Sequence, residues 1–270
     1  MVTPIELKPT EGEGVKSCCA RLYESDYVKL LLGDSFHPGG VKLTERLGEV
    51  LGLAPQSRVL DVAAGQGASA IHLAQRFGCE VVGVDYGSDM VRRANETAAA
   101  QGASDRVRFE RGDAERLPFD NASFDVIICE CAFCTFPDKP AAAREFARVL
   151  KPGGRIGLSD LTRAEVLPKE LDSLLAWVAC IADAQPVEGY ASFLRGAGFT
   201  VSRIEPHDEA LAEMVNQIRA KLLGAELLVG LKKLELPGVD FTAAKDMARS
   251  ALETIQQGKL GYAIVAGEIA

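Results

Sequence analysis

Apolar and polar residues follow one another along the chain in two alternating rhythms. Short apolar runs that end in turn residues predict strands, and apolar residues three or four positions apart predict helices. The predicted strands are 58–65, 80–85, 106–113, 124–131, 155–161, 200–206 and 261–269. The predicted helices are 15–33, 41–52, 68–78, 88–102, 139–154, 168–183, 187–197, 208–235 and 242–258. Since strand and helix alternate between residues 58 and 206, the pattern predicts an α/β fold with a parallel sheet built from βαβ units.

Two predicted helical regions stand outside this alternation. Residues 1–54 hold a polar tail and two helices ahead of the first strand, so we expect a helical N-terminal cover. Residues 207–258 are mostly helical and separate the last two strands, so we expect an insertion that serves as a cap or an interface. A chain of 270 residues can bury one large core, and we expect residues 55–270 to form one domain that contains this insertion.

The composition is that of a globular protein with no affinity for polyanions. Hydrophobic residues make up 47% of the chain, charged residues make up 25%, and the net charge is -8. Binding of nucleic acid would need clusters of lysine and arginine that the sequence lacks, so nucleic acid is not expected as a partner. The polar N-terminus has no signal-peptide core, and no run is long enough to cross a bilayer. We therefore expect a cytoplasmic protein without membrane contact.

One strand-to-helix turn carries the residues of a nucleotide site. Asp61 lies at the end of the first strand, and Gly65 and Gly67 lie in the turn that follows. Glycines let the backbone approach a ligand, and the first turn of the next helix offers unpaired N–H groups. Asp85 ends the second strand, where a carboxylate can accept hydrogen bonds from both hydroxyls of a ribose. Asp113, in the loop after the third strand, can accept one from the exocyclic amine of adenine.

These three elements, in this order, resemble the class I S-adenosylmethionine-dependent methyltransferases over roughly residues 55–205 and the last strand. The resemblance implies a Rossmann-like, seven-stranded sheet with an antiparallel last strand, and S-adenosyl-L-methionine as the cofactor. It places Gly65 and Gly67 near the methionine portion, Asp85 on the ribose and Asp113 near the adenine. The full set of expected cofactor residues is Asp61, Ala63, Gly65, Gly67, Asp85, Tyr86, Met90, Asp113, Ala114 and Glu130.

One position departs from the family pattern. The usual first glycine of the turn is Ala63 in this chain. A dinucleotide requires the complete G-x-G-x-x-G turn, because its pyrophosphate comes close to the backbone. Ala63 therefore argues against a dehydrogenase, whereas S-adenosylmethionine has no phosphate for the turn to hold.

The seven cysteines raise a separate question. In a reducing compartment an odd number does not suit a disulfide framework, so each cysteine is core filler, a ligand or a reactive thiol. Three of them fall in CECAFCTF, residues 129–136, at the end of the fourth strand. Ligands of an open parallel sheet lie beyond the carboxyl ends of its strands, so we expect Cys131 to face the site. Cys129 would share a face with Cys131 if the strand continued, but a single cysteine more often fills the core, so we expect Cys129 to face the core. Cys134 is left open, and Cys79 is expected to fill the core.

Through these cysteines the chain resembles the arsenite methyltransferases in particular. In that family one cysteine follows the fourth strand, another lies after the fifth strand ahead of an L-x-x-A-G-F-like segment, and others lie upstream of the cofactor turn. Cys131 and Cys180 match the first two positions, and Cys18 or Cys19 can supply the third. The resemblance implies a catalytic set of Cys131, Cys180, Cys18 and Cys19, with Cys131, Cys180 and Cys19 as arsenic ligands. The glycine-rich run that follows the second cysteine in the family is IADAQPVEG here.

Thiolates suit this chemistry, because trivalent arsenic prefers sulfur and keeps a lone pair when two or three thiolates hold it. We expect the lone pair to attack the methyl carbon in line, without a general base, and a cellular thiol reductant to take part. Two alternatives stay open. A methyltransferase for an organic small molecule would use His37 or Glu130 as a base. A non-enzymatic thiol module would bind a metal or metalloid and would not bind the cofactor. The sequence leaves the oligomeric state open.

Overall fold

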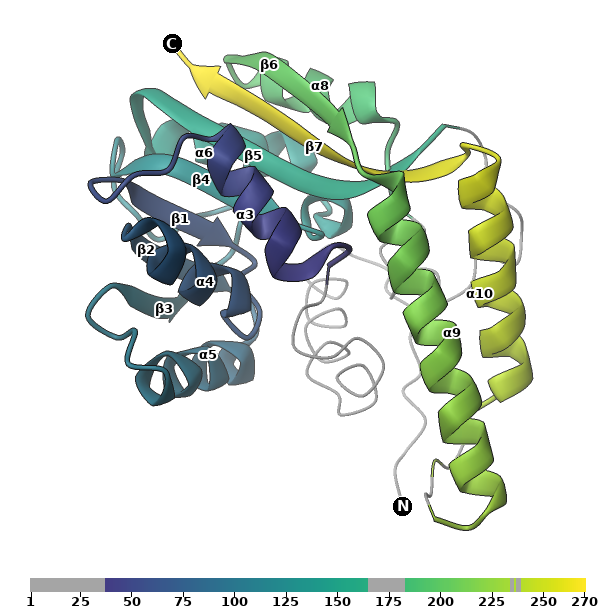
Figure 1. The fold of residues 1–270 in the computed structure, drawn as a ribbon. Helices are drawn as coiled ribbons and strands as arrows, with labels where there is room; N and C mark the ends of the chain where they lie inside the picture. The colour runs from purple at the N-terminus through teal and green to yellow at the C-terminus, as the bar shows by residue number, and fades with distance from the viewer. Residues whose placement is uncertain (1–36, 165–182, 234–235, 237–238) are drawn as a thin grey trace.

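A seven-stranded sheet forms the centre of the protein (Figure 1). The computed structural model describes residues 37–164, 183–233, 236 and 239–270. The strands are β1 Arg58–Val62, β2 Glu80–Asp85, β3 Val107–Arg111, β4 Phe124–Glu130, β5 Leu150–Arg163, β6 Phe199–Pro206 and β7 Leu260–Ile269. Their order is β3-β2-β1-β4-β5-β7-β6, and β7 alone runs antiparallel to its neighbours. The sheet predicted from the sequence is confirmed.

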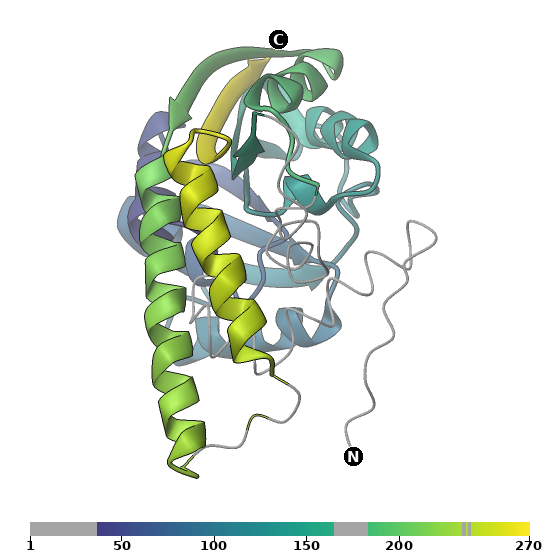
Figure 2. The same ribbon diagram turned by 90° about the vertical axis from the view of Figure 1, so that its right-hand side faces the viewer.

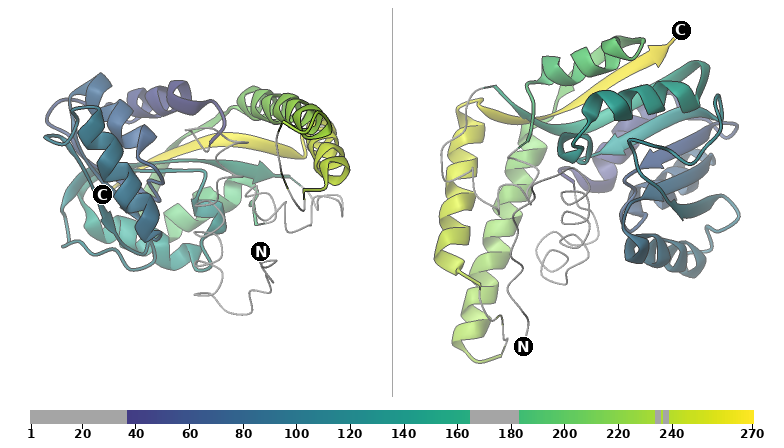
Figure 3. Two further views of the ribbon diagram at one scale, coloured as in Figure 1. Left: turned by 90° about the horizontal axis from the view of Figure 1, so that it is seen from below. Right: turned by 180° about the vertical axis from the view of Figure 1, so that it is seen from behind.

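Helices cover both faces of this sheet. They are α3 Gly40–Val50, α4 Ala68–Phe77, α5 Ser88–Ala100, the short 3-10 helix η1 Phe133–Thr135, α6 Lys139–Val149, α8 Val187–Gly196, α9 Asp208–Gly230 and α10 Phe241–Gln256. The purple and blue helices α3 and α4 lie on one face, and the teal and green helices α6 and α8 lie on the other (Figures 1 and 3). This is the three-layer arrangement that right-handed βαβ units produce.

Two predicted helices end earlier than the sequence pattern indicates. The helix expected over 139–154 ends at Val149, and β5 begins at the next residue. Pro152 has no N–H to continue a helix, and Gly153 adopts a left-handed φ of 71°, so the chain turns there. The helix expected over 208–235 ends at Gly230. The helices expected over 15–33 and 168–183 lie outside the residues that the structure describes, apart from residue 183.

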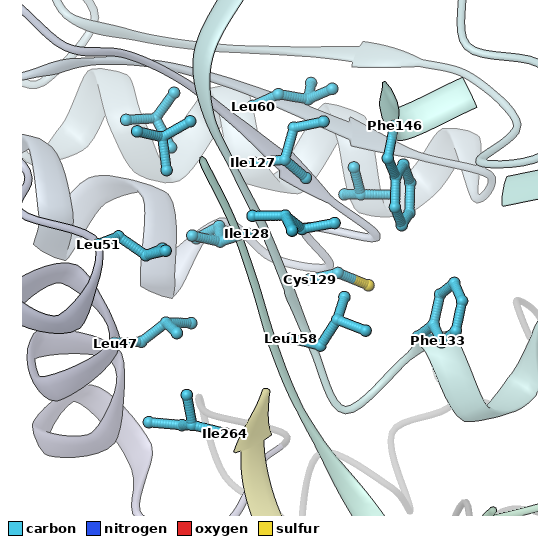
Figure 4. Packing of buried hydrophobic residues seen from close by; sticks show 14 of the residues in the cluster. Leu47, Leu51, Leu60, Ile127, Ile128, Cys129, Phe133, Phe146, Leu158 and Ile264 are labelled. Carbon is cyan, nitrogen blue, oxygen red and sulfur yellow. The ribbon is translucent and has the colours of Figure 1, made fainter. Parts of the chain in front are cut away.

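The core is formed where the central strands are buried on both faces. Leu60, Ile127 and Ile128 are fully buried, as are Leu158 of β5 and Ile264 of β7 (Figure 4). Apolar runs of this kind, without alternation, are what a parallel sheet with two covered faces requires.

Helix α3 lies unusually close to the sheet. A Cβ added at Gly157 of β5 would come within 2.6 Å of Leu47 Cδ1 and 2.8 Å of Leu51 Cδ1. The missing side chain therefore lets α3 pack directly on the strand (Figure 4). This contact brings the side chains at the start of α3 to the edge of the sheet where the site lies.

Helices α9 and α10 form an antiparallel pair between β6 and β7, and the pair projects away from the sheet (Figures 1 and 2). Lys245 of α10 forms an ion pair with Glu226 of α9 at 2.8 Å. At the sheet end, the Tyr262 N–H donates to Asp208 Oδ1 at 2.9 Å. The domain boundary at residues 54 and 55 stays a prediction, as does the function of this pair. No helix among the described residues is long and apolar enough to cross a membrane.

Candidate functional site

The candidate site lies at the carboxyl ends of the central strands. β1 pairs with β2 on one side and with β4 on the other, both in parallel register. The chain connections leave β1 and β4 in opposite directions at this point. In open α/β sheets such a reversal leaves a crevice in which ligands bind. The predicted cofactor residues and Cys131 lie at the carboxyl ends of β1 to β4 or shortly after them.

The turn after β1 has the backbone conformation that glycine favours. Ala63, Gly65 and Gly67 have φ angles of 60°, 54° and 83°. At Ala63 the side chain makes this conformation unfavourable by about 1–2 kcal/mol, because the left-handed region brings Cβ close to the carbonyl oxygen. Gly67 precedes α4, and a Cβ there would lie 2.4 Å from Phe109 Cζ. The turn therefore keeps its shape at Ala63 despite the missing glycine, and Gly67 is sterically required.

Asp85 connects the turn after β1 to the turn after β2. The Gly65 N–H donates to Asp85 Oδ2 at 2.9 Å, and the Gly87 N–H donates to Asp85 Oδ1 at 2.8 Å. These two bonds fix the plane of the carboxylate at the end of β2. A carboxylate oxygen can accept more than one hydrogen bond, so this orientation is compatible with a ribose diol.

Tyr86 and Met90 follow Asp85 in the chain but lie in different environments. The Arg111 guanidinium lies over the Tyr86 ring, 5.8 Å from its centroid. Met90 is 2% exposed in the first turn of α5. Tyr86 is half-buried and presents an aromatic face near the end of β2, whereas Met90 packs inside the protein.

Asp113 and Ala114 lie in the loop after β3, where the sequence places them. Asp113 Oδ1 accepts a hydrogen bond from the Glu115 N–H at 3.0 Å, so the carboxylate stabilises its own turn. Both Asp113 and Ala114 are half-buried. The roles expected for them toward adenine stay predictions.

Asp61 is a deeply buried acid of the site. It is 2% exposed, and its Oδ2 has no hydrogen-bond partner among the described residues. Burial raises the pKa of this carboxyl well above its ordinary value, and the negative charges of Glu130 and Asp85 raise the pKa further. An acid in such a position favours a positively charged ligand, because the ligand offsets the repulsion between the three carboxylates.

Glu130, the last residue of β4, is surrounded by hydroxyl groups. Ser69 Oγ donates to its Oε2 at 2.6 Å and Thr44 Oγ1 donates to the same oxygen at 2.9 Å. Ser159 Oγ lies 3.3 Å from Oε1, and His37 Nε2 lies 3.6 Å from Oε2. The Glu130 side chain is only 4% exposed, so it does not point to solvent.

Sequence reasoning missed three of the residues around Glu130, namely Ser69, Thr44 and Ser159. Ser69 and Thr44 lie inside helices, where an isolated hydroxyl carries no recognisable pattern. Ser159 pairs with Glu130 across β4 and β5. Sequence reasoning could have found Ser159, because the lengths of β4 and β5 limit which residue of β5 can lie beside Glu130.

Cys131 follows β4 directly and is half-buried. Its φ of 52° places it in the left-handed region, which is uncommon for a residue with a side chain. The Cys131 N–H donates to the Ser159 carbonyl oxygen at 2.7 Å, and the Tyr262 hydroxyl donates to that same oxygen at 2.9 Å. These contacts hold the backbone of Cys131 in its unusual conformation.

The other described cysteines are buried. Cys79, Cys129 and Cys134 are each 0% exposed, so the predictions that Cys79 and Cys129 lie in the core are confirmed. The Cys134 N–H donates to Asp160 Oδ2 at 2.9 Å. Burial first, and then the charge of Asp160, raises the pKa of the Cys129 thiol well above its ordinary value. Such thiols are poor ligands at neutral pH, because the thiolate is the binding form.

The remaining cysteines of the predicted catalytic set, Cys18, Cys19 and Cys180, lie outside the described residues. Within the described part of the chain, no three histidine, cysteine, aspartate or glutamate side chains are grouped so that they could hold a metal ion. Among the described cysteines, Cys131 is the one that is not fully buried, and it follows the end of β4.

Comparison with known proteins relates part of this chain to methyltransferases. Residues 59–154 match the model of a methyltransferase domain. The chain is 36% identical over 165 residues to 27-O-demethylrifamycin SV methyltransferase of Amycolatopsis mediterranei, covering 57% of this chain and 60% of the relative. It is 34% identical over 164 residues to an arsenite methyltransferase of Halobacterium salinarum, with 58% and 41% covered. Phosphoethanolamine N-methyltransferase 1 of Arabidopsis thaliana is 35% identical over 163 residues, with 60% and 32% covered.

Solved structures share the fold over almost the whole chain. The cyclase SpnF aligns with a TM-score of 0.78 and 22% identity, over 97% of this chain and 98% of its own. A putative sarcosine dimethylglycine methyltransferase from Galdieria sulphuraria aligns with a TM-score of 0.77 and 22% identity, over 93% and 98%. Since one of these is named as a cyclase, the fold alone does not determine the reaction.

Residues 59–154 therefore match a methyltransferase domain, and the order of the sheet is the Rossmann-like order of the class I methyltransferases. S-adenosyl-L-methionine is the cofactor expected from the sequence, and two solved structures that share this fold contain S-adenosyl-L-methionine or S-adenosylhomocysteine, which confirms that expectation. The chain spans 60% or less of the length of the three curated relatives described above. These relatives have similar identities but are named for different acceptors, so the comparison does not single out arsenite.

Proposed function

We propose that this protein transfers a methyl group from S-adenosylmethionine to trivalent arsenic that is held by thiolates. The single observation that carries the acceptor is Cys131, a half-buried thiol in a left-handed conformation at the carboxyl end of β4. Strained residues persist where the surrounding structure holds them, and they are frequent at functional sites. The likeness to an arsenite methyltransferase supports the same acceptor.

The cofactor side of the site fits a cation with a ribose. S-adenosylmethionine, when bound, supplies an electrophilic methyl group on a positively charged sulfur. Asp61 has a buried oxygen with no partner among the described residues, and it lies close enough to the Asp85 and Glu130 charges to be affected by them. Asp85, whose plane the Gly65 and Gly87 N–H groups fix, is the residue to hold the ribose.

The acceptor side requires a soft ligand next to that cation. Cys131, as a thiolate, would bind arsenic and donate electron density to it, which makes the arsenic lone pair a better nucleophile. A new arsenic–carbon bond forms as the sulfur–carbon bond of the cofactor breaks, and adenosylhomocysteine leaves. Arsenic loses no proton, so the step needs no base, and alignment can supply about 7–11 kcal/mol of the barrier. A cellular thiol reductant would keep arsenic trivalent.

The experiment incubates the protein with labelled S-adenosylmethionine, arsenite and a thiol reductant, and measures methylated arsenic. We expect Cys131→Ser to abolish the product and to leave the affinity for the cofactor unchanged. Cys129→Ser is the matched control, because Cys129 lies two residues earlier, inside β4, and is fully buried. It is expected to retain activity if it folds, which a thermal midpoint checks. If Cys131→Ser produced methylated arsenic at the wild-type rate, the proposal that the acceptor is arsenic bound by Cys131 would be refuted.

One observation favours a second candidate, an organic acceptor that loses a proton. His37 is 8% exposed and contacts Glu130 and Ser69 at the edge of the site, where a base would be useful. This candidate predicts that His37→Asn abolishes methylation of a hydroxylated small molecule, while Cys131→Ser does not. Arsenite binding without any cofactor binding would instead support the non-enzymatic thiol module.

A further inference from the structure

The polar network around Glu130 is not needed for packing alone. Glu130 is a buried acid, and Thr44 and Ser159 are both 0% exposed. A buried charge is unfavourable unless hydrogen bonds replace those that water would make. Apolar side chains at these positions would hold α3 on the sheet without that cost. The presence of a satisfied carboxylate here therefore indicates a role beyond holding the layers together.

One branch of the network leads to the cofactor turn. Ser69 is the second residue of α4 and follows Gly67, the residue that precedes the helix, by two positions. Its bond to Glu130 Oε2, at 2.6 Å, is the shortest that Glu130 makes. Because Ser69 lies in the first turn of α4, this bond fixes the start of the helix relative to β4. The turn between Ala63 and Gly67 contains residues in the left-handed conformation, and the Ser69–Glu130 hydrogen bond lies just after its last residue.

The other branches lead away from the cofactor. Thr44 lies in α3 and shares Glu130 Oε2 with Ser69. Ser159 lies in β5 and faces Oε1. Both oxygens of Glu130 are thus directed at hydroxyl groups of the protein, and the carboxylate is shielded from solvent. This geometry does not suit a base, which must reach a proton of the acceptor.

We propose that Glu130 is a positioning residue, which acts through Ser69 to hold the cofactor turn in its binding conformation. Its carboxylate then serves neither as a base nor as a direct ligand of S-adenosylmethionine. This inference rests on the proposed use of the cofactor, and it adds roles for Glu130 and Ser69 in binding. Thr44 serves the attachment of α3 instead.

A double-mutant cycle tests the inference. The dissociation constant for S-adenosylhomocysteine is measured by calorimetry for the wild type, Glu130→Gln, Ser69→Ala and the double variant, with the thermal midpoint of each. Each single change weakens a hydrogen bond that involves a charged group, so each should weaken S-adenosylhomocysteine binding on the order of tenfold. The double variant should bind no more weakly than Glu130→Gln, because both changes remove the same interaction.

Two further variants separate positioning from folding. Thr44→Val removes the other bond to the same oxygen and should lower the thermal midpoint while the dissociation constant stays within about twofold. Ser202→Ala, on β6 and bonded only weakly to the Ala266 carbonyl at 3.5 Å, should change neither quantity.

Several results would overturn the inference. If Glu130→Gln weakens binding and Ser69→Ala does not, Glu130 acts directly on the ligand. If the two effects multiply in the double variant, the residues act separately. Lowered thermal midpoints with unchanged dissociation constants would show a purely structural network. A wild-type protein that binds no S-adenosylhomocysteine would refute the proposed function itself, and this inference with it.

Discussion

The ring of Phe109 in β3 occupies the space that two glycines leave open. A Cβ at Gly67 would lie 2.4 Å from Phe109 Cζ, and a Cβ at Gly83 would lie 2.2 Å from Phe109 Cδ1. Gly67 has a left-handed φ of 83°, whereas Gly83 of β2 does not lie in that region. Alanine at either position therefore overlaps the same ring, and alanine at Gly67 adds backbone strain.

The overlap with the Phe109 ring and the backbone strain at Gly67 contribute different amounts to the free energy of unfolding. Forcing an extra methyl group into a packed core costs about 1–3 kcal/mol. A Cβ in the left-handed region costs about 1–2 kcal/mol more. We expect Gly83→Ala to lower the free energy of unfolding by about 1–3 kcal/mol and Gly67→Ala by about 2–5 kcal/mol. Phe109→Leu removes Cζ, Cε1 and Cε2, the ring atoms nearest to Gly67, so in that background only the strain at Gly67 should remain. The overlap at Gly83 should persist, because leucine keeps Cδ1 and because Ala64 Cβ lies 2.9 Å from the added Cβ.

Urea denaturation followed by circular dichroism measures these differences. Gly102→Ala is the matched control for strain, because Gly102 has a φ of 67° and no atom within 4 Å of its added Cβ. It should cost about 1–2 kcal/mol in either background. If Gly67→Ala had no remaining cost in the Phe109→Leu background, the strain at Gly67 would be refuted. If Phe109→Leu did not reduce the cost of Gly67→Ala, the Phe109 ring would not be the obstacle.

Three other predictions concern the site. Asp85→Asn should weaken S-adenosylhomocysteine binding by roughly 10- to 100-fold in calorimetry, because asparagine is neutral and leaves the Gly65 or the Gly87 N–H group without its acceptor. Unchanged affinity would contradict the proposed contact of Asp85 with the ribose. Because the pKa of Asp61 is raised in the folded state, its ionisation opposes folding as the pH rises. Asp61→Asn should therefore raise the free energy of unfolding of the ligand-free protein at pH 8, and this gain should disappear toward pH 4 in urea titrations. An equal gain at both pH values would show that the ionisation of Asp61 is not its cause. Iodoacetamide should label Cys131 in the native protein well before Cys129 or Cys134, and peptide mass spectrometry that finds equal labelling would contradict their burial.

Much of the sheet was predictable because its strands have short apolar runs that end in turns. The run 80–85 matches β2 residue for residue, since both faces of that strand are covered. The end of α6 was not predicted, because the apolar spacing continues past Val149 and only Pro152 and Gly153 reverse it. Periodicity alone does not distinguish the last turn of a helix from the first residues of a strand.

The site was predictable only where a residue follows a strand end. Asp85 and Cys131 could be located in this way, because parallel strands end at one edge of the sheet. The hydroxyl groups around Glu130 could not, because Thr44 and Ser159 are 115 residues apart and meet through the packing of α3 on Gly157. The left-handed conformation of Cys131 was also unpredictable, since it arises from the Ser159 carbonyl contact and not from the residue type.

The position of β7 has a consequence for how the protein is made. β7 lies between β5 and β6 in the sheet, but β6 precedes it in the chain and residues 207–259 separate the two. During synthesis at about 5–20 residues per second, β5 and β6 therefore wait on the order of 3–10 seconds for the strand that joins them. In that interval the apolar edge of β5 is unpaired, and such an edge can pair with another chain. The nascent protein should be most prone to aggregation during this interval, and slow translation of α9 and α10 would prolong it.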